Sequence, residues 1–286
     1  MATNGVSGRL HDCYASTDPR TNKDLVKTLS DKNVLMLEAN EVEEVAKLCK
    51  GTDGRIGTKT RALDVRDAVA VKDFVHEVVS DFGGIDVLIF NAARPPQWLP
   101  LSEGSPELWW ESVEIGIRGS YNFSRYVLPV MQKQKSGTII LVGSMGAHGN
   151  AGYSSYTTAK LGILRLAEII HAENFKEYNI KAFCDASEGR FEPGSYIIRG
   201  AEGEEKSVAI AMEHFGHITE WDKPEMGAGM MTVLCSGRLD FLSGRFIDSG
   251  LKVETYLQQK QEILEQDLFR VRLNAGSDGL IPTLKY

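Results

Sequence analysis

Three residues of the sequence could together polarise and protonate a carbonyl oxygen. Tyr156 and Lys160 stand four residues apart in Y-T-T-A-K, and Ser144 precedes the tyrosine in L-V-G-S-M-G-A-H. Positions four apart share one face of a helix, so a helix over Ser155–Tyr178 would place the phenol beside the ammonium group. The apolar run Thr138–Val142 predicts a strand that ends just before Ser144. A serine hydroxyl and a phenol can donate two hydrogen bonds to one oxygen.

The elements that must position these residues alternate between strand and helix. Seven strands are predicted from apolar runs: Leu10–Ala15, Asn33–Ala39, Arg61–Val65, Val87–Asn91, Thr138–Val142, Ile180–Cys184 and Gly244–Ser249. Helical periodicity lies between them, at Ala68–Phe82, Pro106–Gln134 and Ser155–Tyr178. This alternation predicts an α/β fold: a doubly wound, Rossmann-like parallel sheet of seven strands with helices on both faces. Such sheets bind ligands at the carboxyl ends of their strands, where Asn91 and Ser144 both fall.

Composition limits the kind of partner and the organisation of the chain. The 286 residues contain no Pro/Ser-rich linker and no internal repeat, so we expect one domain over residues 1–286. A net charge of −7 argues against nucleic acid and anionic membranes as partners. The apolar runs, about six residues long, are too short to span a bilayer, and the first residues lack the pattern of a signal peptide. Four scattered cysteines without a C-x-x-C pair predict a reducing, cytoplasmic location and no metal site.

The trio and a second motif resemble the short-chain dehydrogenase/reductase family. Members of this family carry Ser, Tyr and Lys in this order, and D-V-L-I-F-N-A-A over Asp86–Ala93 is similar to their N-A-G segment. The resemblance covers roughly Arg9–Arg272 and most of the chain. It implies a homodimer or homotetramer, a small-molecule substrate, a substrate lid at about 188–224 and a C-terminal helical tail at 253–286. The charged tail resembles those of fungal members, which hints at specialised metabolism.

The glycine-rich cofactor loop that the resemblance implies is degenerate. Family members open with T-G-x-x-x-G-x-G, whose glycines let the backbone approach the pyrophosphate of the dinucleotide. At the matching places this chain has Ala15, Pro19 and Thr21. The proline removes a backbone N–H, and Asp18 adds negative charge where a diphosphate would lie. We therefore expect no cofactor-binding residues here.

Two further positions depart from the family pattern. Gly116 stands where the resemblance implies an asparagine that holds a water for proton relay. Ser187 and Glu188 stand where the family has a Pro-Gly pair near the nicotinamide. Three altered features around a retained trio indicate that the site was kept and the hydride chemistry was lost.

The leading hypothesis is a cofactor-independent enzyme that acts on a carbonyl-bearing small molecule as an isomerase, a lyase or dehydratase, or a cyclase. Tyr156 would act as a neutral phenol, and Glu188 or Asp18 would move a proton. The substrate would contact four residues: Asn91, Phe191, Tyr196 and Trp221. The alternative is an NADP(H)-dependent carbonyl reductase or alcohol dehydrogenase. A second alternative is a catalytically inactive partner subunit that keeps only the fold.

Overall fold

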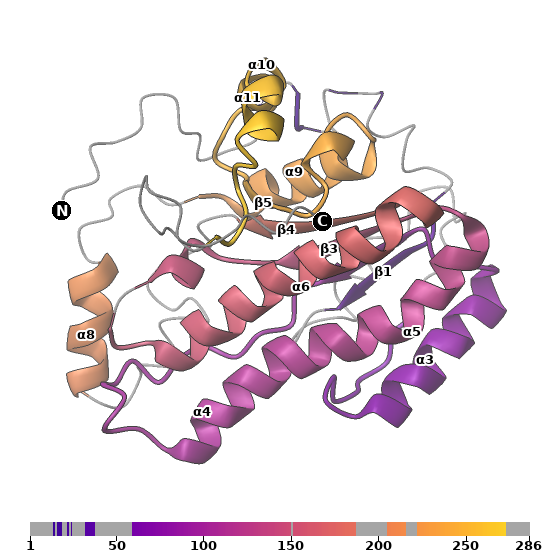
Figure 1. Ribbon diagram of the computed structural model, residues 1–286. Coiled ribbons are helices and arrows are strands. Elements are labelled where there is room, and N and C mark those ends of the chain that lie inside the picture. The colour runs from indigo at the N-terminus through magenta and orange to yellow at the C-terminus, as the bar shows by residue number, and fades with distance from the viewer. Residues whose placement is uncertain are drawn as a thin grey trace.

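The computed structural model describes residues 14, 16–18, 22, 24, 32–37, 59–149, 151–186, 205–215 and 222–272. They form one parallel sheet with the strands in the order β1-β2-β3-β4-β5 (Figure 1). The strands are β1 Val34–Leu37, β2 Val87–Phe90, β3 Gly137–Val142, β4 Ile180–Ala186 and β5 Arg245–Asp248. Phe90 pairs with Leu141, and Val142 pairs with Asp185. The carboxyl ends of β2, β3 and β4 therefore lie at one edge of the sheet.

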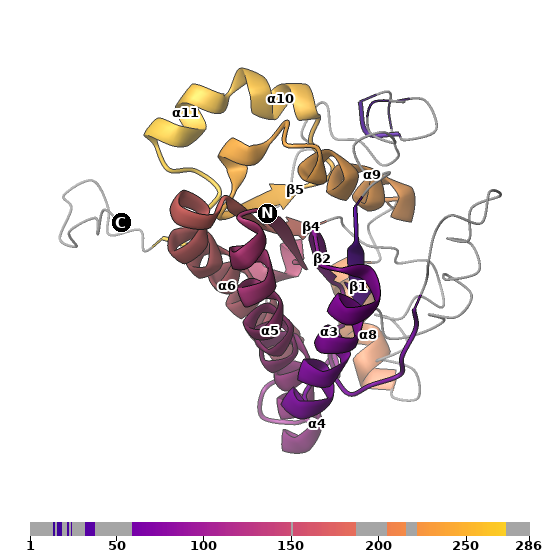
Figure 2. The ribbon, with the colours of Figure 1, turned by 90° about the vertical axis from the view of Figure 1, so that its right-hand side faces the viewer.

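Helices cover both faces of this sheet. The α-helices are α3 Ala68–Phe82, α4 Pro106–Val113, α5 Gly119–Gln134, α6 Ser154–Tyr178, α8 Glu205–Phe215, α9 Pro224–Cys235, α10 Val253–Gln258 and α11 Lys260–Glu265. The shorter turns are the π-helix η1 Glu114–Arg118 and the 3-10 helices η2 Met145–His148 and η3 Asp240–Leu242. Helices α3, α5 and α6 lie on one face, whereas α9, α10 and α11 lie on the other (Figures 1 and 2). The predicted α/β architecture is confirmed.

The apolar faces of the strands build a core on each side of the sheet. Ile139 and Leu141 of β3 point towards the α3, α5 and α6 side, where they join one buried cluster. Ile140, between them in the sequence, joins the second cluster with Met230 of α9 and Tyr256 of α10. This alternation is expected of a strand with helices on both faces, because successive side chains point in opposite directions.

The prediction of a strand at Arg61–Val65 is wrong. Residues 59–64 are irregular, and Val65 and Arg66 form a turn. The carbonyl oxygens of Val65 and Arg66 accept hydrogen bonds from Asn122 Nδ2 at 2.9 and 3.2 Å. Lys59 and Arg61 form ion pairs with Asp81 and Glu77 of α3. The segment is therefore held by side chains of α3 and α5 rather than by a neighbouring strand, and the described part of the sheet has five strands instead of seven.

The other departure is at the N-terminal side of the sheet. The predicted strand Leu10–Ala15 lies outside the described residues except for Tyr14, which is not in a strand. β1 pairs directly with β2, Val34 with Val87, so no other strand lies between them. Of the expected lid at 188–224, the described residues are 205–215 and 222–224, and the expected tail is described as far as residue 272, with α10 and α11. Among the described helices, none is long and apolar enough to cross a membrane.

Candidate active site at the carboxyl edge of the sheet

Ser144 lies just beyond the carboxyl end of β3. It is the N-cap of η2, and its Oγ accepts a hydrogen bond from Gly146 N at 2.9 Å. An accepting hydroxyl keeps its own proton to donate. The preceding residue is fixed to the neighbouring strand, because Gly143 N donates to Asp185 O at 2.7 Å. A Cβ on Gly143 would lie 2.5 Å from Cys184 Sγ, so only glycine allows this close approach. The β3–β4 pairing thus fixes the backbone that carries Ser144.

Tyr156 and Lys160 occupy successive turns near the start of α6, as the spacing predicts. Lys160 is buried, and its Nζ lies 5.5 Å from the centre of the Tyr156 ring. The same Nζ donates to the carbonyl oxygen of Val142 at 2.6 Å, which ties α6 to the end of β3. A Cβ on Gly146 would lie 3.1 Å from both Ser144 Oγ and Tyr156 Cε1. The serine and the tyrosine therefore flank the same glycine, and the structure brings the three residues together.

This arrangement presents hydroxyl donors beside a cation. A carbonyl oxygen placed between Ser144 and Tyr156 could accept from both hydroxyls while the Lys160 charge stabilises negative charge that develops there. Because Lys160 is held by Val142 and by burial, the donors need little reorganisation when a substrate binds. The geometry suits any reaction that passes through an enolate or another oxyanion.

Gly116 packs against the helix that carries the tyrosine. It lies in the π-helix η1, between α4 and α5. A Cβ on Gly116 would lie 3.0 Å from Ala159 Cβ and 3.6 Å from Ile163 Cδ1. An asparagine side chain would not fit there without movement of α6. Close packing against α6 therefore explains the glycine at this position. The water-holding asparagine that the family resemblance implies would need α6 to move.

A buried carboxyl group lies at the same edge of the sheet. Asp185 of β4 is fully buried, and its Oδ1 accepts from Ser249 Oγ at 2.8 Å. Its Oδ2 has no hydrogen-bond partner in the described structure. Burial raises the pKa of Asp185 to about 7, despite the hydrogen bond from Ser249.

Asp18 lies on a segment that is anchored to α10. Tyr14 and Asp18 form a turn in which Asp18 N donates to Tyr14 O at 2.9 Å. Tyr14 Oη accepts from Val253 N, and Ser16 Oγ donates to Glu254 Oε1 at 2.5 Å. Burial raises the pKa of Tyr14 to about 12. The turn therefore lies against the start of α10, just after β5.

The remaining predicted site residues divide into two groups. Asn91 follows β2 directly and is half-buried at the carboxyl edge of the sheet. Seven residues fall outside the described part of the chain: Ala15, Pro19, Thr21, Glu188, Phe191, Tyr196 and Trp221.

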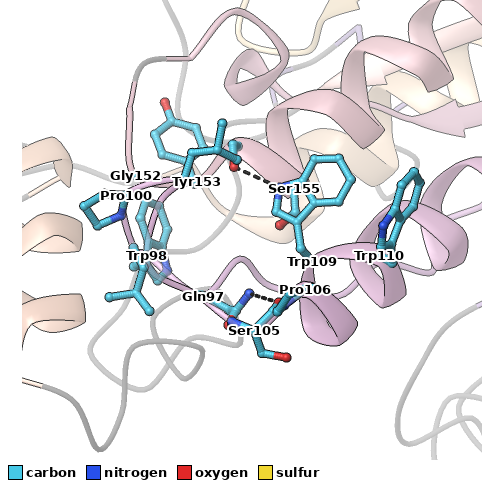
Figure 3. Close-up of a pocket in the computed structure, with 14 residues that line it drawn as sticks. Gln97, Trp98, Pro100, Ser105, Pro106, Trp109, Trp110, Gly152, Tyr153 and Ser155 are labelled. Carbon is cyan, nitrogen blue, oxygen red and sulfur yellow. Dashed lines mark hydrogen bonds between the residues drawn. The ribbon is translucent and has the colours of Figure 1, made fainter.

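A cavity of about 310 Å³ lies next to the start of α6 (Figure 3). Its walls include Trp98, Trp109, Trp110 and Tyr153. Trp98 and Tyr153 form a small buried cluster against which Tyr156 packs. The cavity therefore adjoins the tyrosine of the trio without being lined by it. Apart from the adjacent tryptophans at 109 and 110, no sequence motif indicates this cavity.

The described strands lack the reversal of strand order at which sheets of this type bind a nicotinamide dinucleotide. In dinucleotide-binding sheets the strand order reverses beside the first strand, and a glycine-rich turn follows that strand. Here the five described strands run in sequential order with no reversal, and β1 pairs directly with β2. The sequence after β1, E-A-N-E-V-E-E, contains no glycine and four glutamates, which would repel a diphosphate. Over the described ranges, no group of three or more His, Cys, Asp and Glu side chains could hold a metal ion.

Comparisons with known proteins agree with the fold. The family model for short chain dehydrogenases matches residues 22–186. Short chain dehydrogenase mpl6 of Monascus purpureus is 31% identical over 212 residues, 74% of this chain and 68% of that protein. The 3-oxoacyl-acyl-carrier-protein reductase FabG of Thermotoga maritima is 27% identical over 220 residues, 76% of this chain and 85% of that protein.

A solved structure gives the same result for the fold. NAD+-bound xylitol dehydrogenase superposes with a TM-score of 0.65 at 20% identity, over 84% of this chain and 97% of that one. Since the family model covers more than half of the sequence and a relative exceeds 30% identity, the chain belongs to the short chain dehydrogenase family.

Proposed function

We propose that this protein acts on a carbonyl-bearing small molecule without a nicotinamide cofactor, as an isomerase, a lyase or dehydratase, or a cyclase. One observation carries the proposal. Lys160 Nζ is fixed to Val142 O at 2.6 Å beside Tyr156, so the trio is assembled, whereas the strand next to β2 is followed by glutamates instead of glycines. This contrast supports a site that binds an oxyanion and does not hold the diphosphate of a dinucleotide.

The chemistry follows from the donors. Ser144 and Tyr156 would each donate a hydrogen bond to the substrate carbonyl oxygen, and Lys160 would stabilise the negative charge that forms on it. Removal of a proton from the neighbouring carbon would give an enolate. That enolate can return the proton at another carbon, expel a leaving group at the β-carbon or attack a second carbonyl. We assign the proton transfer to Glu188 or Asp18, and further substrate contacts to Asn91, Phe191, Tyr196 and Trp221.

A second candidate function is carbonyl reduction with NADP(H). It is favoured by family membership and by the 27% identity to a protein named as a 3-oxoacyl-acyl-carrier-protein reductase. In that case Tyr156 would donate a proton to the oxygen while hydride reached the carbon. The residues after β1 weigh against it, because they offer no glycine-rich turn for the diphosphate.

Calorimetric titration with NADPH and NADH separates the two functions. We expect no saturable heat in the micromolar range, because neither the sequence at positions 15–21 nor the seven residues after β1 contain the glycines of a diphosphate-binding turn. A nicotinamide-dependent reductase titrated under the same conditions is the positive control. Saturable micromolar binding by this protein would replace the first function with the second.

We also propose that the protein forms a homodimer or homotetramer. Large apolar side chains are exposed on two adjacent helices, Tyr121 on α5 and Leu161 and Ile169 on α6. Covering them with a second copy would remove apolar surface from water. Light scattering coupled to size exclusion should show a mass above that of one chain, and Leu161→Asp should lower it; a monomeric wild-type protein would contradict this proposal.

A further inference from the structure

Four of the fourteen residues that line the cavity beside α6 are aromatic. The rings of Trp98 and Tyr153 are tilted by 48° with 5.0 Å between their centres, and Trp109 and Trp110 meet edge to face at the same distance (Figure 3). All fourteen residues that line the cavity are described, and none of them is charged. The volume of about 310 Å³ is at the lower end of small-molecule pockets, so it would hold one ring system rather than a large ligand.

Trp98 forms a wall of this cavity in an unusual backbone conformation. Its φ is 55°, in the left-handed region that bulky residues rarely adopt. The side chain is almost fully buried against Tyr153 and helix α8. The neighbouring Gln97 is fixed as well, because its carbonyl accepts from Ser207 Oγ of α8 at 3.0 Å. The packing around Trp98 therefore holds its ring at the cavity. Strained backbone conformations of this kind are often found at binding sites.

Polar groups around the cavity are largely used within the protein. Gln97 Nε2 donates to Ser105 O at 3.2 Å, and its Oε1 accepts from Ser105 N at 2.9 Å. The indole N–H of Trp109 donates to Ser154 Oγ at 2.9 Å. These bonds fix the walls and engage polar groups that a ligand would otherwise meet, while the aromatic rings offer faces and edges for contact. Aromatic faces favour stacking with a planar ring.

An aromatic cage can also bind a cation, but two features disfavour that ligand. No carboxylate lines the cavity to balance a positive charge. The N-termini of α4 and α6 both border it, at Ser105 and Ser154, and helix N-termini carry partial positive charge. A neutral ring avoids both penalties.

We infer that this cavity binds an uncharged, planar aromatic ring system belonging to the substrate, next to Tyr156. That the ring belongs to the substrate rests on the proposed function, whereas ring binding itself can be measured without turnover. Tyr156 packs against Trp98 and Tyr153, so a ring in the cavity would place its substituents at the tyrosine end of the site.

Calorimetric binding of three probes tests the ligand class. 2-Naphthol is a neutral planar bicycle, 2-decalol is its saturated counterpart, and phenyltrimethylammonium is a cation. We expect 2-naphthol to bind at least about tenfold more tightly than either of the others. Equal or tighter binding of the cation, equal binding of 2-decalol, or no binding of 2-naphthol would overturn the inference.

Variants locate the binding and separate it from catalysis. Trp110 lines the cavity but is 60% exposed, so Trp110→Ala should fold normally and weaken 2-naphthol binding about tenfold. Leu264→Ala, at an exposed apolar residue of α11 outside the cavity, is the matched control and should bind like the wild type. Tyr156→Phe should also keep ring binding, because the cavity walls are unchanged. Unchanged binding in Trp110→Ala would overturn the inference, whereas a failure of the proposed chemistry would leave these binding results intact.

Discussion

Gly116 of the π-helix η1 packs directly against Ala159 of α6. A Cβ on Gly116 would lie 3.0 Å from the Cβ of Ala159, closer than side chains normally pack. Ala159 precedes Lys160 directly and is buried. The lack of a side chain on Gly116 therefore allows η1 to lie close to the part of α6 that contains Tyr156 and Lys160.

Gly116→Ala should destabilise the protein by about 1 kcal/mol. Overpacking typically costs about 1–3 kcal/mol, and the better helix propensity of alanine offsets about 1 kcal/mol of that. Urea denaturation measures the change in the free energy of unfolding. The double variant Gly116→Ala/Ala159→Gly should be more stable than the sum of the two single changes predicts, because the second change makes room for the added methyl group. Strict additivity would show that the two positions do not share this contact.

Tyr156→Phe should lower turnover of a carbonyl substrate by about 10²–10³-fold, because it removes one preorganised donor to the developing oxyanion. The fold should be unchanged, since the ring still packs on Trp98 and Tyr153. Tyr178→Phe, at the far end of the same helix, is the control and should keep full activity. Full activity in a folded Tyr156→Phe protein would mean that another group binds the oxygen.

Asp185→Asn should change how stability depends on pH. The pKa of Asp185 is raised from 3.8 to about 7, so the folded protein keeps its proton where the unfolded chain has lost it. This contribution to stability is complete below pH 3.8 and is lost as pH rises to about 7, with a slope of at most about 1.4 kcal/mol per pH unit. The asparagine variant should lack this slope. Urea denaturation across the window measures it.

The quantity to plot against pH is the free energy of unfolding of the wild type minus that of Asp185→Asn. Burial lowers the pKa of His171 from 6.5 to about 4, so His171 makes stability rise with pH over an overlapping range. That contribution is the same in both proteins and cancels in the difference. A difference that stays flat across the window would show that Asp185 is ionised in the folded protein.

The local geometry of Ser144, Tyr156 and Lys160 was more predictable than the sheet. Spacing places Tyr156 and Lys160 on one helical face, and an apolar strand ends just before Ser144; both are local properties that a sequence displays. The predicted strand Arg61–Val65 has the right composition, but a strand also needs a partner, and Asn122 takes the carbonyl group of Val65 instead. Tertiary packing decides which residue donates a hydrogen bond to the carbonyl oxygen of Val65, and the sequence of the segment does not show it.

The aromatic cavity could not be read from the sequence for a related reason. Trp98, Trp109 and Tyr153 come from a loop and the starts of two helices, and they meet only because α4 and α6 begin side by side. Likewise Asp185 follows an apolar run that fits a buried strand, but nothing in that run indicates that one of its oxygens lacks a partner. Convergence of distant segments has no short sequence signature.

The bond from Gly143 N to Asp185 O has a consequence for motion. This bond lies one residue beyond the last residue pair of the ladder, Val142 with Asp185, and Gly143 is buried. The Gly143 amide should therefore exchange its hydrogen more slowly than the amide of the exposed Met145 in η2. Ser144, one residue further on, is then attached to the sheet through its backbone, which limits how far its hydroxyl can move between turnovers.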